Sequence, residues 1–258
     1  MTGRTGDERD RDASAQDERP TVAVFRPDDE RLAEAVSLLR ELGGDPIADP
    51  MLTVEPTDER PREDAEYAIL TSKTGVELAT AAGWDPGETT VCAIGPATAA
   101  ALGVAGYAVD VVPEVYTSAG LVEHLRGDVD GARIEVARSD HGSPVLLEGL
   151  GTAGAYVHET ILYRLTRPAA SGSSTELAAA GALDAACFTS SLTVEHFVEA
   201  AAERGLRDDA LNGLEAAVVG VIGPPTSETL ADHGIDADVV ASEATFEVLA
   251  RETLAALD

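Results

Sequence analysis

Residues that could bind an anion lie in a short motif that this chain contains twice. GPATA begins at Gly95 and GPPTS begins at Gly223, and each motif follows an apolar run. The proline has the fixed φ of a first helical position, and the three amides after it have no intrahelical acceptor. Such N–H groups, with the helix dipole behind them, form an anion site. The second copy has one donor fewer, because a proline replaces the alanine.

A second motif, Thr-Ser, also occurs twice, ending at Ser72 and at Ser190. In the first copy Thr74 and Glu77 have the spacing of a capping box, which predicts that Ser72 is left free to face a ligand. The second copy lacks this threonine, so we expect Ser190 itself to cap the helix that follows. Each motif alone is also ordinary helix-capping sequence, and only the presence of both motifs in both halves favours a binding function.

The sequence contains none of the familiar catalytic motifs, such as GxGxxG, a Walker loop, GxSxG, HExxH or CxxC. Its five histidines have no ligand spacing, so we do not expect a metal. Arg26 and Arg138 lie at the ends of two predicted strands and could add positive charge for an anionic ligand.

Short β-rich runs alternate with amphipathic stretches of about a dozen residues, which is the pattern of βα units in a parallel sheet. We predict ten strands, at 21–26, 46–54, 67–71, 90–94, 108–112, 132–138, 155–163, 185–189, 216–222 and 237–240.

The two halves of the chain contain the same short sequence motifs in the same order. ILTSKTGVE at 69–77 matches CFTSSLTVE at 187–195, and IGPATAAAL at 94–102 matches IGPPTSETL at 222–230. Such a repeat indicates gene duplication, and five strands per copy suffice for one flavodoxin-like, doubly wound sheet. The pattern predicts two equivalent α/β lobes. It does not decide whether each copy forms its own lobe or the copies exchange their first two strands.

Composition limits the class of partner. The 258 residues include 47 acidic and 18 basic ones, a net charge of −29, which argues against nucleic acid and anionic membranes. This acidic balance is typical of halophilic proteins, which work in salt that screens the repulsion. Residues 1–20 contain no Val, Ile, Leu or Phe and are expected to form a disordered tail. Two cysteines in apolar runs, without a disulfide framework, favour a reducing cytoplasm.

The ordered set of words resembles uroporphyrinogen-III synthase over nearly all of residues 21–258. The words that carry the resemblance are FRP at 25–27, LTSKTGVE at 70–77, IGPATAAAL at 94–102, VVPEVYTSAGL at 111–121, ETILY at 159–163, FTSSLTVEHF at 188–197 and IGPPTSETL at 222–230.

The resemblance implies that the lobes exchange strands and are joined by a two-strand hinge. One lobe would use 21–49 with 167–258 and the other 53–163, with linkers at 50–52 and 164–166. It also implies the reaction, in which hydroxymethylbilane, a linear tetrapyrrole octacarboxylate, loses water and closes with inversion of its last ring, without metal or cofactor. Tyr163 would act as the general acid. The residues expected to bind substrate are Arg26, Ser72, Lys73, Gly95, Ala97, Thr98, Arg138, Ser190, Ser191, Gly223 and Thr226.

Two other functions remain open from the sequence. A two-lobed binding protein or ligand-responsive regulator would share the fold without catalysing a reaction, and a tetrapyrrole-binding relative could have lost activity. The chain has no heptad pattern and no extra apolar helix, so a monomer is expected.

Overall fold

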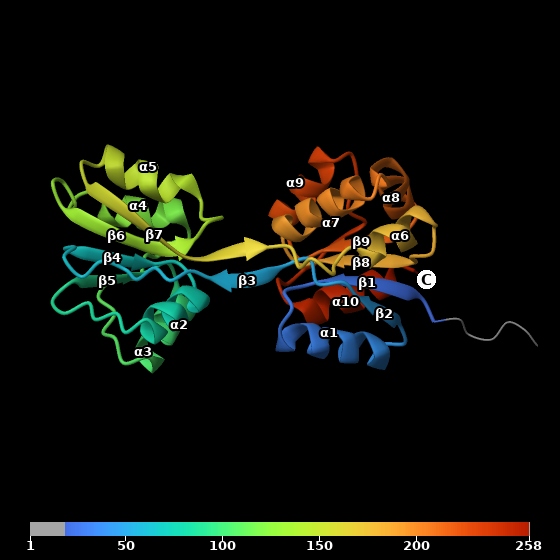
Figure 1. The fold of residues 1–258 in the computed structure, drawn as a ribbon, viewed down its shortest axis with the longest axis horizontal. Helices are drawn as coiled ribbons and strands as arrows, with labels where there is room; N and C mark the ends of the chain where they lie inside the picture. The colour runs from blue at the N-terminus through green and yellow to red at the C-terminus, as the bar shows by residue number, and fades with distance from the viewer. Residues whose placement is uncertain (1–18, 258) are drawn as a thin grey trace, which may run out of the picture. The chain divides into compact units, whose positions relative to one another are not determined.

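The computed structural model describes residues 19–257, which form alternating strands and helices (Figure 1). The strands are β1 (Thr21–Phe25), β2 (Asp45–Ala48), β3 (Thr53–Pro56), β4 (Tyr67–Leu70), β5 (Thr90–Ala93), β6 (Arg133–Ser139), β7 (Tyr156–Thr166), β8 (Ala185–Phe188), β9 (Val218–Val221) and β10 (Val239–Val240). The helices are α1 (Glu30–Glu41), α2 (Lys73–Ala81), α3 (Pro96–Val104), α4 (Ser118–Leu125), α5 (Pro144–Thr152), α6 (Ser173–Ala179), α7 (Ser191–Glu203), α8 (Arg207–Glu215), α9 (Pro224–Asp232) and α10 (Phe246–Ala255).

The described residues form two compact units. Unit 1 contains the chain up to Thr53 together with the chain from Arg167 onward, and unit 2 contains Val54–Thr166. The sheet of unit 1 has the order β10-β9-β8-β1-β2, and the sheet of unit 2 has the order β3-β7-β6-β4-β5. The first two strands of each copy therefore lie in the sheet that holds the later strands of the other copy, so the expected strand exchange is confirmed.

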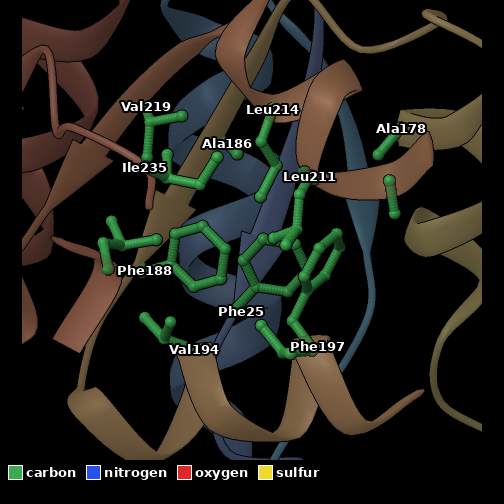
Figure 2. Packing of buried hydrophobic residues seen from close by; sticks show 14 of the residues in the cluster. Phe25, Ala178, Ala186, Phe188, Val194, Phe197, Leu211, Leu214, Val219 and Ile235 are labelled. Atoms are coloured by element: carbon green, nitrogen blue, oxygen red, sulfur yellow. The ribbon is translucent and has the colours of Figure 1, made fainter. Parts of the chain in front are cut away.

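Aromatic packing joins the two copies within unit 1. Phe25 on β1 stacks on Phe188 of β8 with ring centroids 4.4 Å apart, and Phe197 of α7 meets both rings edge-on (Figure 2). All three side chains are fully buried. Aromatic pairs add stability beyond the area that they bury, so this cluster stabilises the pairing of a first-copy strand with a second-copy strand.

The sheet of unit 2 is covered on both faces. Ala68 and Leu70 of β4 pack in the cluster that includes α2 and α3, whereas Ile69 between them packs in the cluster that includes α4 and α5. This alternation is what a strand buried on both faces produces, and it explains why β4 reads as a continuous apolar run.

Two predicted strands and one predicted linker differ from the observed elements. The run 46–54 is two strands, β2 and β3, in different units, because Pro50 has no amide hydrogen to continue a ladder. The run 108–112 reduces to one bridge at Val111, since the Asp110 carboxylate accepts the amide of Val91. The predicted linker 164–166 is strand, because β7 continues to Thr166.

Residues 1–18 of the expected tail lie outside the described residues. Within the described part, the carbonyl of Pro20 accepts a hydrogen bond from the amide of Asp45 at 2.8 Å, which places Pro20 at the start of β1, beside the edge strand β2. No helix among residues 19–257 is long and apolar enough to cross a membrane.

Candidate active site

The paired motifs lie on neighbouring strands in each unit. In unit 2, β4 and β5 are parallel with Leu70 opposite Ala93, so the Thr-Ser turn and the Gly-Pro turn leave the sheet side by side. In unit 1, β8 and β9 are parallel with Phe188 opposite Val221, which gives the same arrangement. Ligands of open parallel sheets bind at these carboxyl ends, so each unit carries one set of candidate binding turns.

The Gly-Pro turn of unit 2 has two free backbone donors. Gly95 is the N-cap of α3 and Pro96 is its first residue. The amide of Ala99 donates to the carbonyl of Gly95 at 3.0 Å, so the prediction of three free amides is wrong by one. The amides of Ala97 and Thr98 find no acceptor within residues 19–257. The Thr98 side chain is buried beside these amides.

The Gly-Pro turn of unit 1 differs from its repeat. The amides of Thr226 and Ser227 both donate to the carbonyl of Gly223, at 3.1 and 3.2 Å, and Pro225 has no amide hydrogen. The helix thus begins with a tight, 3₁₀-like hydrogen bond, and no amide of residues 224–227 is free. The expectation of a second backbone anion site is wrong, although the side chain of Thr226 remains at the same place as that of Thr98.

Ser72 caps its helix, contrary to the prediction. Its backbone is extended, and its Oγ accepts the amide of Gly75 at 2.9 Å. Helix α2 begins at Lys73, so Thr74 is already a helical residue and cannot be the cap. The ammonium of Lys73 is exposed and pairs with Glu77 at 3.6 Å.

Ser190 caps α7, as expected. Its Oγ accepts the amide of Thr193 while the threonine hydroxyl accepts the amide of Ser190, which completes a capping box. The next residue, Ser191, donates its hydroxyl to the carbonyl of Pro225 at 3.0 Å. This bond ties the Thr-Ser turn of unit 1 to its Gly-Pro turn.

A β-bulge directs Tyr163 toward Ser72. The register of β7 against β6 shifts between Arg138 and Ser139, so Ile161 faces Arg138 while Tyr163 faces Ser139. As a result, Leu162 and Tyr163 both pack in the cluster with α2, whereas regular alternation would turn Tyr163 to the opposite face. Bulges of this kind re-aim side chains near active sites.

The Tyr163 hydroxyl donates to Ser72 Oγ at 3.0 Å, and the tyrosine is 7% exposed. Ser72 Oγ therefore accepts two hydrogen bonds, from Tyr163 and from Gly75. A serine hydroxyl has two acceptor sites and one proton, so the Ser72 proton must point to a third partner. The arrangement can deliver a proton to an atom bound beside Ser72.

The two repeated arginines have different environments. The Arg138 side chain is 6% exposed, with its Nε 2.5 Å from a carboxylate oxygen of Glu159 and its Nη1 2.5 Å from the carbonyl of Ser143. Its guanidinium is thus occupied inside unit 2 and holds β6, β7 and the start of α5 together. The prediction that Arg138 binds substrate does not fit this ion pair.

Arg26 is half-buried and lies over the ring of Phe246, 4.9 Å from its centroid. Its Nε is buried and has no hydrogen-bond partner within the described chain. Burial and the nearby charge of Arg31 lower the pKa of Arg26, although an arginine stays protonated at any physiological pH. Arg26 directly follows β1, the strand next to β8, so its positive charge lies at the carboxyl end of that strand.

Two features of this site were not predicted from the sequence. The bulge that aims Tyr163 leaves no signal in ETILY, because its side-chain pattern reads as an unbroken strand. The ion-pair partner of Arg138 is Glu159, the first residue of ETILY. An arginine in an apolar strand, followed by an acidic residue in the next strand, is the sequence pattern that would have indicated this ion pair. Among residues 19–257 no group of three His, Cys, Asp or Glu side chains could hold a metal ion.

Two flavodoxin-like sheets that exchange their first strands, each with paired turns at one edge, define a duplicated α/β protein. The family model described as "Uroporphyrinogen-III synthase HemD" matches residues 33–251. The chain therefore belongs to the uroporphyrinogen-III synthase family.

Similar proteins agree with this assignment. A protein of Methanothermobacter thermautotrophicus, provisionally named as a uroporphyrinogen-III synthase, is 35% identical over 84% of this chain and 90% of its own length. A protein of Archaeoglobus fulgidus with the same provisional name is 28% identical over 88% and 94%.

Solved structures share the fold. A crystal structure of a mutant uroporphyrinogen III synthase from Thermus thermophilus matches with a TM-score of 0.66 and 19% identity, over 92% of this chain and 98% of that one. The Helicobacter pylori enzyme, a uroporphyrinogen-III synthetase, matches with a TM-score of 0.59 and 15% identity, over 92% and 99%.

Proposed function

We propose that this chain closes hydroxymethylbilane to uroporphyrinogen III as a cyclising lyase, with unit 2 supplying the proton and the carboxylate-binding amides. One observation carries the proposal: the Tyr163–Ser72 hydrogen bond lies at the end of β4, next to the turn with the free amides of Ala97 and Thr98. A proton donor and an anion site on adjacent strand ends fit a substrate that loses a hydroxyl group and carries carboxylates.

The chemistry needs geometry more than strong catalysts. A pyrrole nitrogen of the bilane can push out the terminal hydroxyl, which leaves as water once it has accepted a proton, and an electrophilic azafulvene remains. Attack by the substituted carbon of the last ring forms a spirocyclic intermediate that leads to the inverted isomer. Correct orientation of the reacting ends can lower the barrier by roughly 7–11 kcal/mol without an activated nucleophile.

Tyr163 is the proposed general acid, acting through Ser72. The Ser72 hydroxyl donates its proton to the departing hydroxyl of the substrate and takes the Tyr163 proton along their existing hydrogen bond. Tyrosine is protonated near neutral pH and is a known type of general acid. A hinge or core tyrosine with a satisfied hydroxyl is the competing interpretation, and the kinetics of Tyr163→Phe distinguish the two.

Substrate carboxylates need local donors, since the chain as a whole carries a charge of −29. The amides of Ala97 and Thr98 provide positive potential at the start of α3, and Arg26 provides a guanidinium. The remaining proposed binding residues are Ser72, Lys73, Gly95, Ser190, Ser191, Gly223 and Thr226. Arg138 we now assign to the structure of unit 2.

We further propose that the protein works as a monomer in the cytoplasm of a cell with concentrated internal salt. The acidic composition supports a high internal salt concentration, because salt screens the repulsion among 47 carboxylates. The two buried free thiols support a reducing compartment. Light scattering in dilute and in molar salt measures the molecular mass and so tests whether the protein is a monomer.

The decisive experiment is an isomer assay. Freshly prepared hydroxymethylbilane is mixed with the protein in molar salt, the products are oxidised, and uroporphyrins I and III are separated by chromatography. Spontaneous closure gives type I, so we expect the protein to divert the product to type III. Type I alone, from protein shown to be folded by circular dichroism, would leave a non-catalytic binding protein as the function.

A further inference from the structure

One exposed aromatic side chain covers the Gly-Pro turn of unit 2. Tyr116 is 60% exposed, and a β-carbon at Gly95 would lie 3.2 Å from its Cβ and 3.4 Å from its Cγ. The side chain of Tyr116 therefore starts directly against the N-cap of α3, one residue before the helix that carries the free amides of Ala97 and Thr98. This side chain is not part of the hydrophobic core and has no role in the mechanism proposed above.

The segment that carries Tyr116 is held in place by its neighbours. The amide of Thr117 donates to the carbonyl of Val115, and the Thr117 side chain caps α4 by accepting the amide of Gly120 at 3.0 Å. A β-carbon at Gly120 would lie 2.1 Å from that same carbonyl oxygen, so the turn packs directly on the helix. An exposed ring on such a fixed turn needs little further ordering to bind a ligand.

The second copy of the repeat has no such ring. Residue 244, the counterpart of Tyr116 at the displacement of 128 shared by the Gly-Pro motifs, is alanine. A β-carbon at Gly223, the counterpart of Gly95, would meet nothing within 4 Å. The ring and the free amides thus occur together in unit 2 and are both missing from the corresponding turn of unit 1.

We propose that Tyr116 is a substrate-binding residue that stacks on a pyrrole ring whose carboxylate side chain binds the amides of Ala97 and Thr98. This inference rests on the proposed function, and it names unit 2 as the place where one end of the linear tetrapyrrole is held. Pyrrole rings are flat and aromatic and carry carboxylates within reach of the ring plane. They match an exposed tyrosine side chain that packs on Gly95, the residue that precedes the helix start with the two free amides.

The stacking face, and not the hydroxyl, is the part of Tyr116 that this role requires. The residue contributes little to the core, since most of its surface is open to solvent. Its substitution should therefore affect ligand affinity more than folding.

The test compares Tyr116→Ala, Tyr116→Phe and a matched control, Val104→Ala, which truncates another exposed apolar side chain of unit 2. Two readouts are measured in molar salt: kcat and KM for type III formation, and the affinity for uroporphyrin III from porphyrin fluorescence. For Tyr116→Ala we expect KM and the dissociation constant of uroporphyrin III to rise about 2- to 12-fold, with kcat changed less. Tyr116→Phe and Val104→Ala should behave like the starting protein.

The possible results distinguish a failure of the proposed role of Tyr116 from a failure of the proposed function. If the starting protein forms no type III isomer, the proposed function fails, whatever Tyr116 does. If the starting protein forms type III but Tyr116→Ala leaves both KM and uroporphyrin affinity unchanged, only the role of Tyr116 is overturned. A loss in Tyr116→Phe as large as in Tyr116→Ala also overturns it, because the ring would then not be the binding group. Thermal unfolding of each variant identifies any loss that comes from misfolding.

Discussion

The Tyr163 hydroxyl donates to Ser72 Oγ at 3.0 Å, although the two residues are 91 positions apart. Ser72 belongs to the first copy of the repeat, and Tyr163 lies on β7, the second strand of the second copy. They meet because β6 of the second copy pairs with β4 of the first copy, and β7 pairs with β6 in the same sheet. Strand exchange therefore assembles the proposed proton donor from both copies, and neither copy alone contains it.

The first prediction concerns Tyr163→Phe. This variant keeps the ring packed against α2 but removes the proton that replaces the one Ser72 gives to the leaving group, so we expect kcat to fall about 100-fold, within the range of general acid catalysis. KM and uroporphyrin III affinity should change less than fourfold, because the carboxylate donors are untouched. Steady-state kinetics and porphyrin fluorescence measure these quantities. Equal losses in kcat and in affinity would make Tyr163 a binding residue.

The repeat supplies a matched pair for Ser72. Ser72→Ala and Ser190→Ala each remove a helix N-cap, so each should lower the free energy of unfolding by about 1 kcal/mol. Only Ser72 contacts Tyr163, so only Ser72→Ala should reduce kcat strongly. The double variant Ser72→Ala/Tyr163→Phe should be no slower than the slower single variant, since residues that act as one unit are not additive. Equal kcat losses at Ser72 and Ser190 would contradict the relay.

Ala97→Pro tests the backbone donors. Proline already occupies the matching position in the second copy, as Pro225, so the helix start accommodates it and the fold should survive. The substitution removes one N–H group beside the Thr98 amide, and we expect KM to rise about tenfold, the effect of losing one hydrogen bond to a charged group. Pro225→Ala makes the reverse change without removing a donor and should not raise KM. An unchanged KM in Ala97→Pro would exclude the amide site.

The sequence predicted what depends on local pattern and missed what depends on register. The repeat and the apolar runs indicated the sheets, and Ser190 was correctly identified as a cap from the residues that follow it. Ser72 was misjudged, because Thr74 and Glu77 have the spacing of a capping box while α2 begins at Lys73. The bulge at Leu162 depends on how β7 aligns with β6, a strand pairing that side-chain alternation alone does not reveal.

The two repeated arginines give a contrasting prediction. Arg138→Ala breaks an ion pair whose arginine is buried, so we expect a loss of about 3 kcal/mol in unfolding free energy, near the low end for broken buried pairs. The Glu159 side chain is 32% exposed, so water can solvate its charge once the arginine is removed, and this limits the loss. Arg26→Ala should cost much less stability but raise KM about tenfold. Urea unfolding and kinetics in the same salt check both, and a stability loss at Arg26 larger than at Arg138 would reverse the assignment.

The two cysteines predict a pH dependence. Burial raises the pKa of Cys92, helped by the charge of Asp110, and burial raises the pKa of Cys187, from 9.0 to about 12 in each case. Only a thiolate reacts with a disulfide reagent, so the folded protein at pH 8.5 should release almost no chromophore from Ellman's reagent. In denaturant both thiols regain ordinary acidity and two equivalents should react.

The same shifts fix the sign of a stability change. A folded-state pKa above the unfolded value means that the native protein holds these protons more tightly, so the stabilisation is complete below about pH 9 and is lost as the pH rises toward 12. The urea midpoint should therefore fall between pH 8 and pH 10.5, and it should fall less in the double variant Cys92→Ala/Cys187→Ala, which has no thiols to ionise. Thiols that react in the folded protein as fast as in denaturant would show that the two strands open in solution, and the buried environment of β5 and β8 would then be wrong.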